Sequence, residues 1–135
     1  MLGGVILAAV AVVVVAIAIS SGGGGGTNGL QTGAKSTQLV AQVTSLLTGI
    51  PQSGATLGNP KAPVTITYYG DLQCPVCQQF TLNGGFPELV AKDVRAGKVK
   101  VVYRAFQTAT QSPQTFQTQQ VAALAAGKLN HFWDY

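Results

Sequence analysis

The sequence predicts an α/β fold in which a dithiol stands between a β-strand and an α-helix. Residues 64–69 are β-branched and aromatic throughout, which is typical of a buried strand, and residues 98–106 predict a second strand. A helical pattern lies between them and begins at Cys74 and Cys77, the only two cysteines of the 135 residues. Strand, helix and strand in this order predict parallel strands with a right-handed crossover, and the dithiol at the C-terminal edge of the first strand.

The segment from Cys74 to Cys77 has the residues that a helix start needs. Cys74 is predicted as the N-cap, and Pro75 then occupies the first helical position, where its missing N–H is not required. Residues three apart lie on one helix face, so Cys77 can form a disulfide with Cys74. A thiolate at a helix N-terminus is stabilised by unpaired N–H groups and by the macrodipole. We therefore expect Cys74 to attack and Cys77 to resolve.

Three segments precede this unit. Residues 2–19 form an unbroken apolar run that predicts a transmembrane anchor, and a cleaved signal peptide is the alternative because Ala16-Ile17-Ala18 has the small-x-small pattern of a cleavage site. Residues 20–35 are rich in glycine and predict a flexible linker. Residues 36–50 have apolar positions near helical spacing, with Ser36 as N-cap, and predict a short amphipathic helix.

The remaining pattern gives the outline of residues 51–135. Residues 51–63 are rich in turn formers, the helix after Cys77 is expected to break at residues 83–85, and Gly97 is expected to end the helical region. Residues 107–118 predict a polar loop, and a further helix is expected from about Gln119. The large apolar side chains predicted as core are Phe80, Phe86, Phe106, Phe132 and Trp133.

Composition and spacing exclude several classes of function. The net charge is +4, but the eight basic residues are scattered from Lys35 onward, so we expect no nucleic-acid binding. A structural zinc site needs two more nitrogen or sulfur ligands, and the sequence offers only His131. Attachment of c-type haem needs a histidine where Gln78 stands. We expect no metal or cofactor, and a purely structural disulfide remains as the alternative to redox chemistry.

The sequence around the dithiol resembles the DsbA-like thioredoxin-fold proteins of bacteria. The resemblance covers about residues 54–135 and rests on residues 57–64, on Gly97-Lys98-Val99, on Phe132-Trp133-Asp134-Tyr135 and, most specifically, on Asp71-Leu72-Gln73-Cys74-Pro75-Val76-Cys77. It implies a thioredoxin-like fold of the DsbA type, with a helical insertion that begins near the C-terminus of this chain. It also implies thiol–disulfide exchange in which Cys74 is the nucleophile and Cys77 the resolving thiol. The implied partners are cysteine-containing envelope or secreted proteins and a redox partner protein.

The resemblance also implies a cellular location, and the sequence departs from the family in two respects. It is greatest for the membrane-anchored type, which predicts a single-pass protein of the bacterial cell membrane, held by residues 2–19 as a signal-anchor, with its C-terminal domain extracytoplasmic. Val76 stands where the DsbA motif has a histidine, so we expect a less depressed pKa for Cys74. Asp71 either tunes the dithiol or closes the turn after the strand.

The second departure concerns the length of the domain. Nothing after Phe106 matches the cis-proline loop, the two later strands and the closing helix of the fold. We therefore expect residues 51–135 to be a partial domain from a truncated fragment, with an open edge on the strand that begins at Val64. The alternative functions are a non-catalytic membrane-anchored binding module with a structural disulfide, and an inactive fragment that lacks the cis-proline half.

Overall fold

The structure is a computed structural model that describes residues 34–135. The predicted anchor at residues 2–19 and nearly all of the predicted linker lie outside this range. Within it, no helix combines the length and the apolar character needed to cross a membrane. The elements in chain order are α2 (Ala34–Leu47), β1 (Gln52–Ser53), β2 (Thr56–Leu57), β3 (Val64–Gly70), α3 (Pro75–Asn83), α4 (Gly85–Leu89), the π-helical turn η1 (Val90–Val94), β4 (Val99–Ala105) and α5 (Pro113–Lys128).

The strands form one mixed sheet in the order β1-β2-β4-β3. Strands β3 and β4 are parallel, with Val64 opposite Val99 and Gly70 opposite Ala105, and helices α3 and α4 and the η1 turn form the crossover between them. This confirms the predicted strand–helix–strand unit. The β1–β2 hairpin, which pairs antiparallel with β4, was not predicted from the turn-rich residues 51–63.

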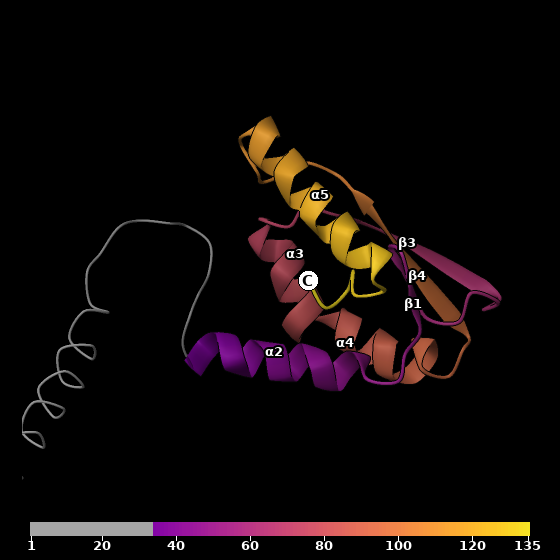
Figure 1. Ribbon diagram of the computed structural model, residues 1–135. Coiled ribbons are helices and arrows are strands. Elements are labelled where there is room, and N and C mark those ends of the chain that lie inside the picture. The colour runs from indigo at the N-terminus through magenta and orange to yellow at the C-terminus, as the bar shows by residue number, and fades with distance from the viewer. Residues whose placement is uncertain (1–33) are drawn as a thin grey trace, which may run out of the picture. The chain divides into compact units, whose positions relative to one another are not determined.

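The core lies on one face of the sheet, the side on which Figure 1 shows the helices. Val99, Val101 and Tyr103 alternate along β4 and are buried on this face, as the alternation at the start of this strand predicts. The larger cluster joins Val99 and Val101 to α2, α4 and η1, and the smaller one joins Tyr103 to Ala123 of α5 and to Phe132. The C-terminal ends of β3 and β4 therefore reach the edge of a packed core, next to the start of α3.

Strand β3 differs from the expected buried strand. Most of its residues are exposed, including Val64 at 50% and Tyr69 at 63%. The reason is its position at the end of the sheet, where β4 is its only neighbour within residues 34–135. This agrees with the open edge expected for the strand that begins at Val64. A run of β-branched residues predicts a strand but does not tell a central strand from an edge strand.

Helix α5 begins earlier than predicted. Its first residue is Pro113, and the Ser112 hydroxyl accepts a hydrogen bond from the Thr115 N–H at 3.2 Å. The predicted loop at residues 107–118 is therefore helical over its second half. Serine followed by proline is a strong N-terminal signal, but the glutamines and threonines after it hid the apolar spacing on which the prediction relied.

The aromatic core is partly as predicted. Phe86 and Phe132 are buried, and the half-buried Trp133 packs against both clusters. Phe80 and Phe106 are exposed, at 40% and 59%, so their assignment to the core was wrong. Phe80 belongs to α3, which contributes no buried residue, although its ring contacts that of Phe86 at 6.0 Å between centroids. Phe106 follows the end of β4.

The predicted amphipathic helix and the break after α3 are present, but the bounds of the first helix differ from the prediction. Helix α2 begins at Ala34 and ends at Leu47, so Ser36 lies inside the helix and is not its N-cap. Leu47 in the last turn of α2 and Ile50 after it are buried in the larger cluster, and α3 ends at Gly84. Gly97, with a φ of +70°, ends the helical region before β4. Its N–H donates to the Val94 carbonyl at 2.9 Å.

Candidate active site

The two cysteines lie at the start of α3, where β3 ends. Cys74 is the N-cap in extended conformation, and Pro75 is the first residue of the helix. The Cys77 N–H donates to Cys74 Sγ at 3.3 Å, and the Gln78 N–H donates to the Cys74 carbonyl at 3.0 Å. Both cysteines are half-buried and are not joined by a disulfide in this structure. The local sequence pattern therefore gives the predicted cap, with the Cys74 sulfur facing unpaired helix N–H groups.

The surroundings of Cys74 favour its thiolate. Its pKa is lowered from the ordinary value, chiefly by hydrogen bonding with the Cys77 side chain and with the Cys77 N–H. Partial burial opposes this shift, while the Val76 N–H and the Thr108 hydroxyl add to it. The Val76 side chain is 77% exposed. The lowered pKa favours thiolate formation at Cys74. Its role as nucleophile, and the expectation that its pKa is less depressed than in DsbA itself, stay predictions.

Asp71 lies three residues before Cys74 and is 3% exposed. Its Oδ1 accepts the Gln73 N–H at 3.0 Å, and its backbone carbonyl accepts the Cys74 N–H at 3.0 Å, so it closes the predicted turn. Its Oδ2 also accepts three N–H groups from residues 108–110. Burial raises the pKa of Asp71, but hydrogen bonds, first from the Thr110 hydroxyl and N–H, lower it by more, so it stays well below its usual range.

Tyr68 faces the second cysteine and was not predicted as a site residue. Its ring lies 5.8 Å from that of Phe80 and 5.9 Å from that of Tyr103, measured between centroids. A side chain at Gly70 would not fit here, because its Cβ would lie 2.9 Å from the Tyr103 ring and 3.1 Å from the Tyr68 ring. Burial, and then hydrogen bonding with the Cys77 side chain, raise the pKa of Tyr68. Nothing in the sequence next to the dithiol indicates this contact.

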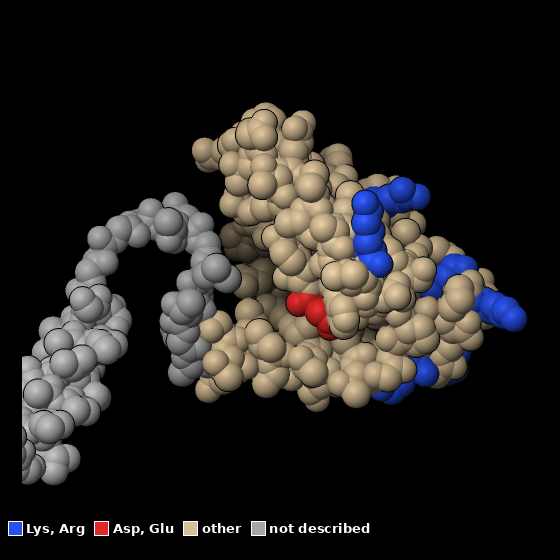
Figure 2. Space-filling view, in the orientation of Figure 1, with Lys and Arg blue, Asp and Glu red and all other residues tan. Residues whose placement is uncertain are grey.

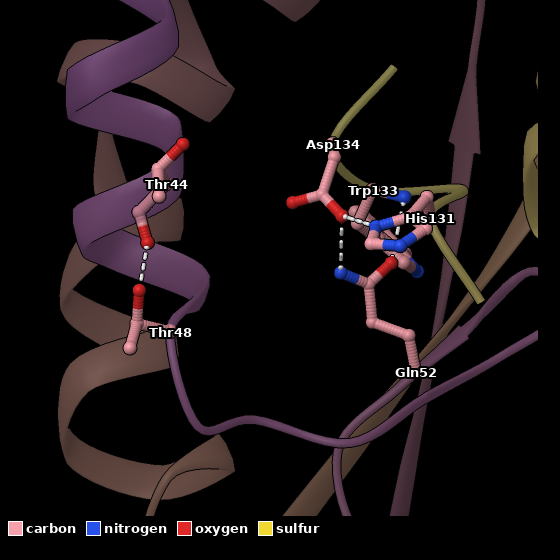
Figure 3. A network of polar contacts seen from close by, with 6 residues as sticks. All are labelled: Thr44, Thr48, Gln52, His131, Trp133 and Asp134. Atoms are coloured by element: carbon pink, nitrogen blue, oxygen red, sulfur yellow. Dashed lines mark hydrogen bonds and ion pairs between the residues drawn. The ribbon is translucent and has the colours of Figure 1, made fainter.

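A second group of polar side chains joins β1 to the residues around Asp134 (Figure 3). Asp134 Oδ2 accepts from Gln52 Nε2 at 3.1 Å and lies 2.7 Å from His131 Nδ1. The Trp133 N–H donates to Gln52 Oε1 at 2.9 Å. These residues border an open groove of about 260 Å³ against α2, and no residue of the dithiol turn lines it. The contacts fasten the end of the chain to β1.

The surface in Figure 2 is mostly uncharged. Lysine and arginine side chains lie in separate places on this face and do not form one patch. Within residues 34–135 no three histidine, cysteine, aspartate or glutamate side chains are grouped so that they could hold a metal ion.

A dithiol at the N-terminus of the crossover helix between parallel strands is the arrangement of the thioredoxin-fold dithiol proteins. The sequence profile described as thioredoxin matches residues 52–135, and the chain belongs to this family. Among solved structures, oxidised BdbD from Bacillus subtilis is similar, with a TM-score of 0.52 and 26% sequence identity over 62% of this chain and 46% of that chain. The predicted resemblance to DsbA-like proteins is thereby confirmed.

The similarity covers less than the whole of the related protein. This chain spans about half the length of BdbD, 46% of it. No curated protein sequence matches the chain.

Proposed function

We propose that the chain is a thiol–disulfide oxidoreductase that exchanges a Cys74–Cys77 disulfide with cysteines of extracytoplasmic proteins. The observation that carries the proposal is the position of Cys74 as the N-cap of α3, where its sulfur accepts the Cys77 N–H at 3.3 Å. This contact and the other donors around the sulfur favour the Cys74 thiolate, both as a nucleophile and as the group that leaves the mixed disulfide. Membership of the thioredoxin family supports the same reading.

The proposed reaction consists of two successive thiol–disulfide exchange steps. A client thiolate attacks Cys74 Sγ of the disulfide, a mixed disulfide forms, and Cys77 leaves as a thiolate. A second client thiolate then attacks the client sulfur of the mixed disulfide, and Cys74 leaves as a thiolate. The client loses two electrons and gains a disulfide, and the enzyme becomes the dithiol. A redox partner protein in its disulfide form then accepts the two electrons and is reduced, which restores the Cys74–Cys77 disulfide. The same steps in reverse reduce a client disulfide, and a partner in its dithiol form then supplies the two electrons.

The proposed setting is the outer side of a bacterial cytoplasmic membrane. The apolar run at residues 2–19 supports a single-pass anchor, and the glycine-rich residues 20–35 support a tether between the anchor and the domain. Disulfide chemistry on proteins persists in oxidising compartments, which supports an extracytoplasmic domain. The clients are then cysteine-containing envelope or secreted proteins.

Trapping of mixed disulfides tests the proposal. The full chain is expressed in a bacterial cell envelope as C77S, as C74S and as the double variant, and covalent adducts are separated on non-reducing gels. C77S should accumulate adducts that dithiothreitol releases, because the resolving thiol is missing. C74S and the double variant should accumulate none above background.

The contrast between the two single variants decides the outcome. Equal adduct levels in C74S and C77S, or no adducts in either, would reject catalytic exchange through Cys74. A module whose disulfide is a structural staple would show no asymmetry of this kind. The double variant controls for adducts that do not involve these cysteines.

A further inference from the structure

Asp71 connects two loops that are far apart in the sequence. Its Oδ2 accepts the N–H groups of Thr108, Ala109 and Thr110 at 2.9, 2.8 and 2.8 Å, and its Oδ1 accepts the Thr110 hydroxyl. The same residue bonds the cysteine turn, since its Oδ1 accepts from Gln73 and its carbonyl accepts from Cys74. A carboxylate that only closes a turn would not need the three donors of the second loop.

The charge of Asp71 is balanced by hydrogen bonds alone. The ion pairs within residues 34–135 join other residues, and Asp71 is in none of them. Rotation of the Asp71 side chain would leave the N–H groups of residues 108–110 and the Thr110 hydroxyl without this acceptor. The carboxylate is therefore held in one orientation. The segment at residues 108–110 is thereby bonded to the same carboxylate as the cysteine turn. The Thr108 hydroxyl is one of the groups that lower the pKa of Cys74, after the side chain and N–H of Cys77 and the Val76 N–H.

We propose that Asp71 is a positioning residue that holds the 108–110 segment against the cysteine turn, so that the Thr108 hydroxyl donates to Cys74 and stabilises its thiolate. Asp71 then acts on Cys74 through Thr108 and not through its own charge. The two routes would shift the pKa of Cys74 in opposite directions. A negative charge near Cys74 disfavours the thiolate, whereas a hydroxyl aimed at the sulfur favours it. The inference refines the proposed function, on which its biological meaning rests, but its chemistry is measured on the thiol itself.

The pH dependence of Cys74 alkylation tests the inference. The full chain in nonionic detergent is reduced, the reductant is removed, and short pulses of iodoacetamide are applied between pH 5 and pH 10. The Cys74 peptide is then quantified by mass spectrometry. The variants are Thr108→Val, Asp71→Asn and the double variant. Thr108→Val removes the hydroxyl but keeps the N–H that bonds Asp71.

We expect Thr108→Val to shift the midpoint of the profile upward and to slow alkylation below the midpoint about three- to tenfold, the effect of one hydrogen bond to the thiolate. Asp71→Asn should shift the midpoint in the same direction. The double variant should shift it no further than the larger single shift, because both changes remove one interaction. Thr118→Val, whose hydroxyl bonds a carbonyl of its own helix, and Asp93→Asn should leave the midpoint unchanged.

The opposite results would overturn the inference. An unchanged midpoint in Thr108→Val removes the hydroxyl from the mechanism, and a lowered midpoint in Asp71→Asn shows that the carboxylate acts by charge. Additive shifts in the double variant show two separate effects. Should Asp71→Asn fail to fold, Thr108→Val still decides, since Thr108 is exposed. Failure of adduct trapping together with these shifts would reject the proposed function and keep the positioning role.

Discussion

Asp71 keeps its negative charge in a buried position because hydrogen-bond donors surround its carboxylate. Burial alone would raise its pKa, and the donors from Thr110, Gln73 and Thr108 lower it by more. In the unfolded chain the pKa returns to about 3.9. A group whose pKa is lower in the folded state stabilises the fold fully above the unfolded pKa, and this contribution is lost as the pH falls through the folded pKa.

We predict that Asp71→Asn lowers the free energy of unfolding at pH 7 by about 1–3 kcal/mol, because an amide cannot accept all the buried N–H groups that face it. The difference between wild type and variant should narrow below about pH 4, where the wild type begins to lose the contribution of the carboxylate. Urea unfolding followed by circular dichroism at pH 7 and pH 3 measures both values. A difference that stays constant between these pH values would contradict the prediction, and Asp93→Asn is the matched control.

One arginine bonds the C-terminal end of helix α2 to the segment that follows η1. Arg95 follows η1, and its guanidinium donates to the Thr48 carbonyl at 2.8 Å and to the Leu46 carbonyl at 2.7 Å. These carbonyls lie at the C-terminal end of α2, where a cation is also favoured by the helix macrodipole. Two segments separated by 47 residues are joined in this way, and Leu47 is buried between them and the sheet.

We predict that Arg95→Ala lowers the free energy of unfolding by about 0.5–1.5 kcal/mol, a range kept small because the arginine is exposed. Arg95→Lys should recover only part of this loss, since an ammonium lacks the planar fork that reaches two carbonyls. Hydrogen exchange of the α2 amides should increase more than exchange in β4. Arg104→Ala, an exposed arginine on β4, is the control. Equal losses for the two alanine variants would contradict the specific role of Arg95.

Across the whole described structure, Trp133 joins the two parts of the core. Its ring stacks on Phe86 of the larger cluster at 5.3 Å between centroids and meets Phe132 of the smaller cluster at 5.9 Å. Its indole N–H donates to the Ala55 carbonyl at 3.2 Å. Trp133, which the sequence predicted as a core residue, therefore packs against both clusters.

We predict that Trp133→Ala lowers the free energy of unfolding by about 2–4 kcal/mol, somewhat less than for a fully buried tryptophan. The loss should be visible in urea unfolding followed by circular dichroism, which does not depend on the fluorescence of the single tryptophan. Tyr135→Ala removes another aromatic ring from the same segment, but this ring is 62% exposed, so its effect should stay within about 0.5 kcal/mol. A Trp133→Ala loss as small as this would contradict the bridging role.

The sequence by itself determined the dithiol and its immediate geometry. Cys74, Pro75 and Cys77 lie within one helical turn, and the cap depends on neighbours in the chain, so local chemistry is sufficient to predict it. The parallel pairing of β3 and β4 also followed from the sequence, because the order of strand, helix and strand leaves few other connections.

Only the tertiary structure decided which residues surround the sulfur atoms. Thr108 lies 37 residues from Asp71, and the two meet because parallel strands end at the same edge of the sheet. Tyr68 interacts with Cys77 in a site where Gly70 leaves room for the rings of Tyr68 and Tyr103, both of which a side chain at residue 70 would strike. The exposure of β3 likewise depends on the strand order and not on its own residues. Contacts between distant segments are set by register and packing, which a local pattern does not contain.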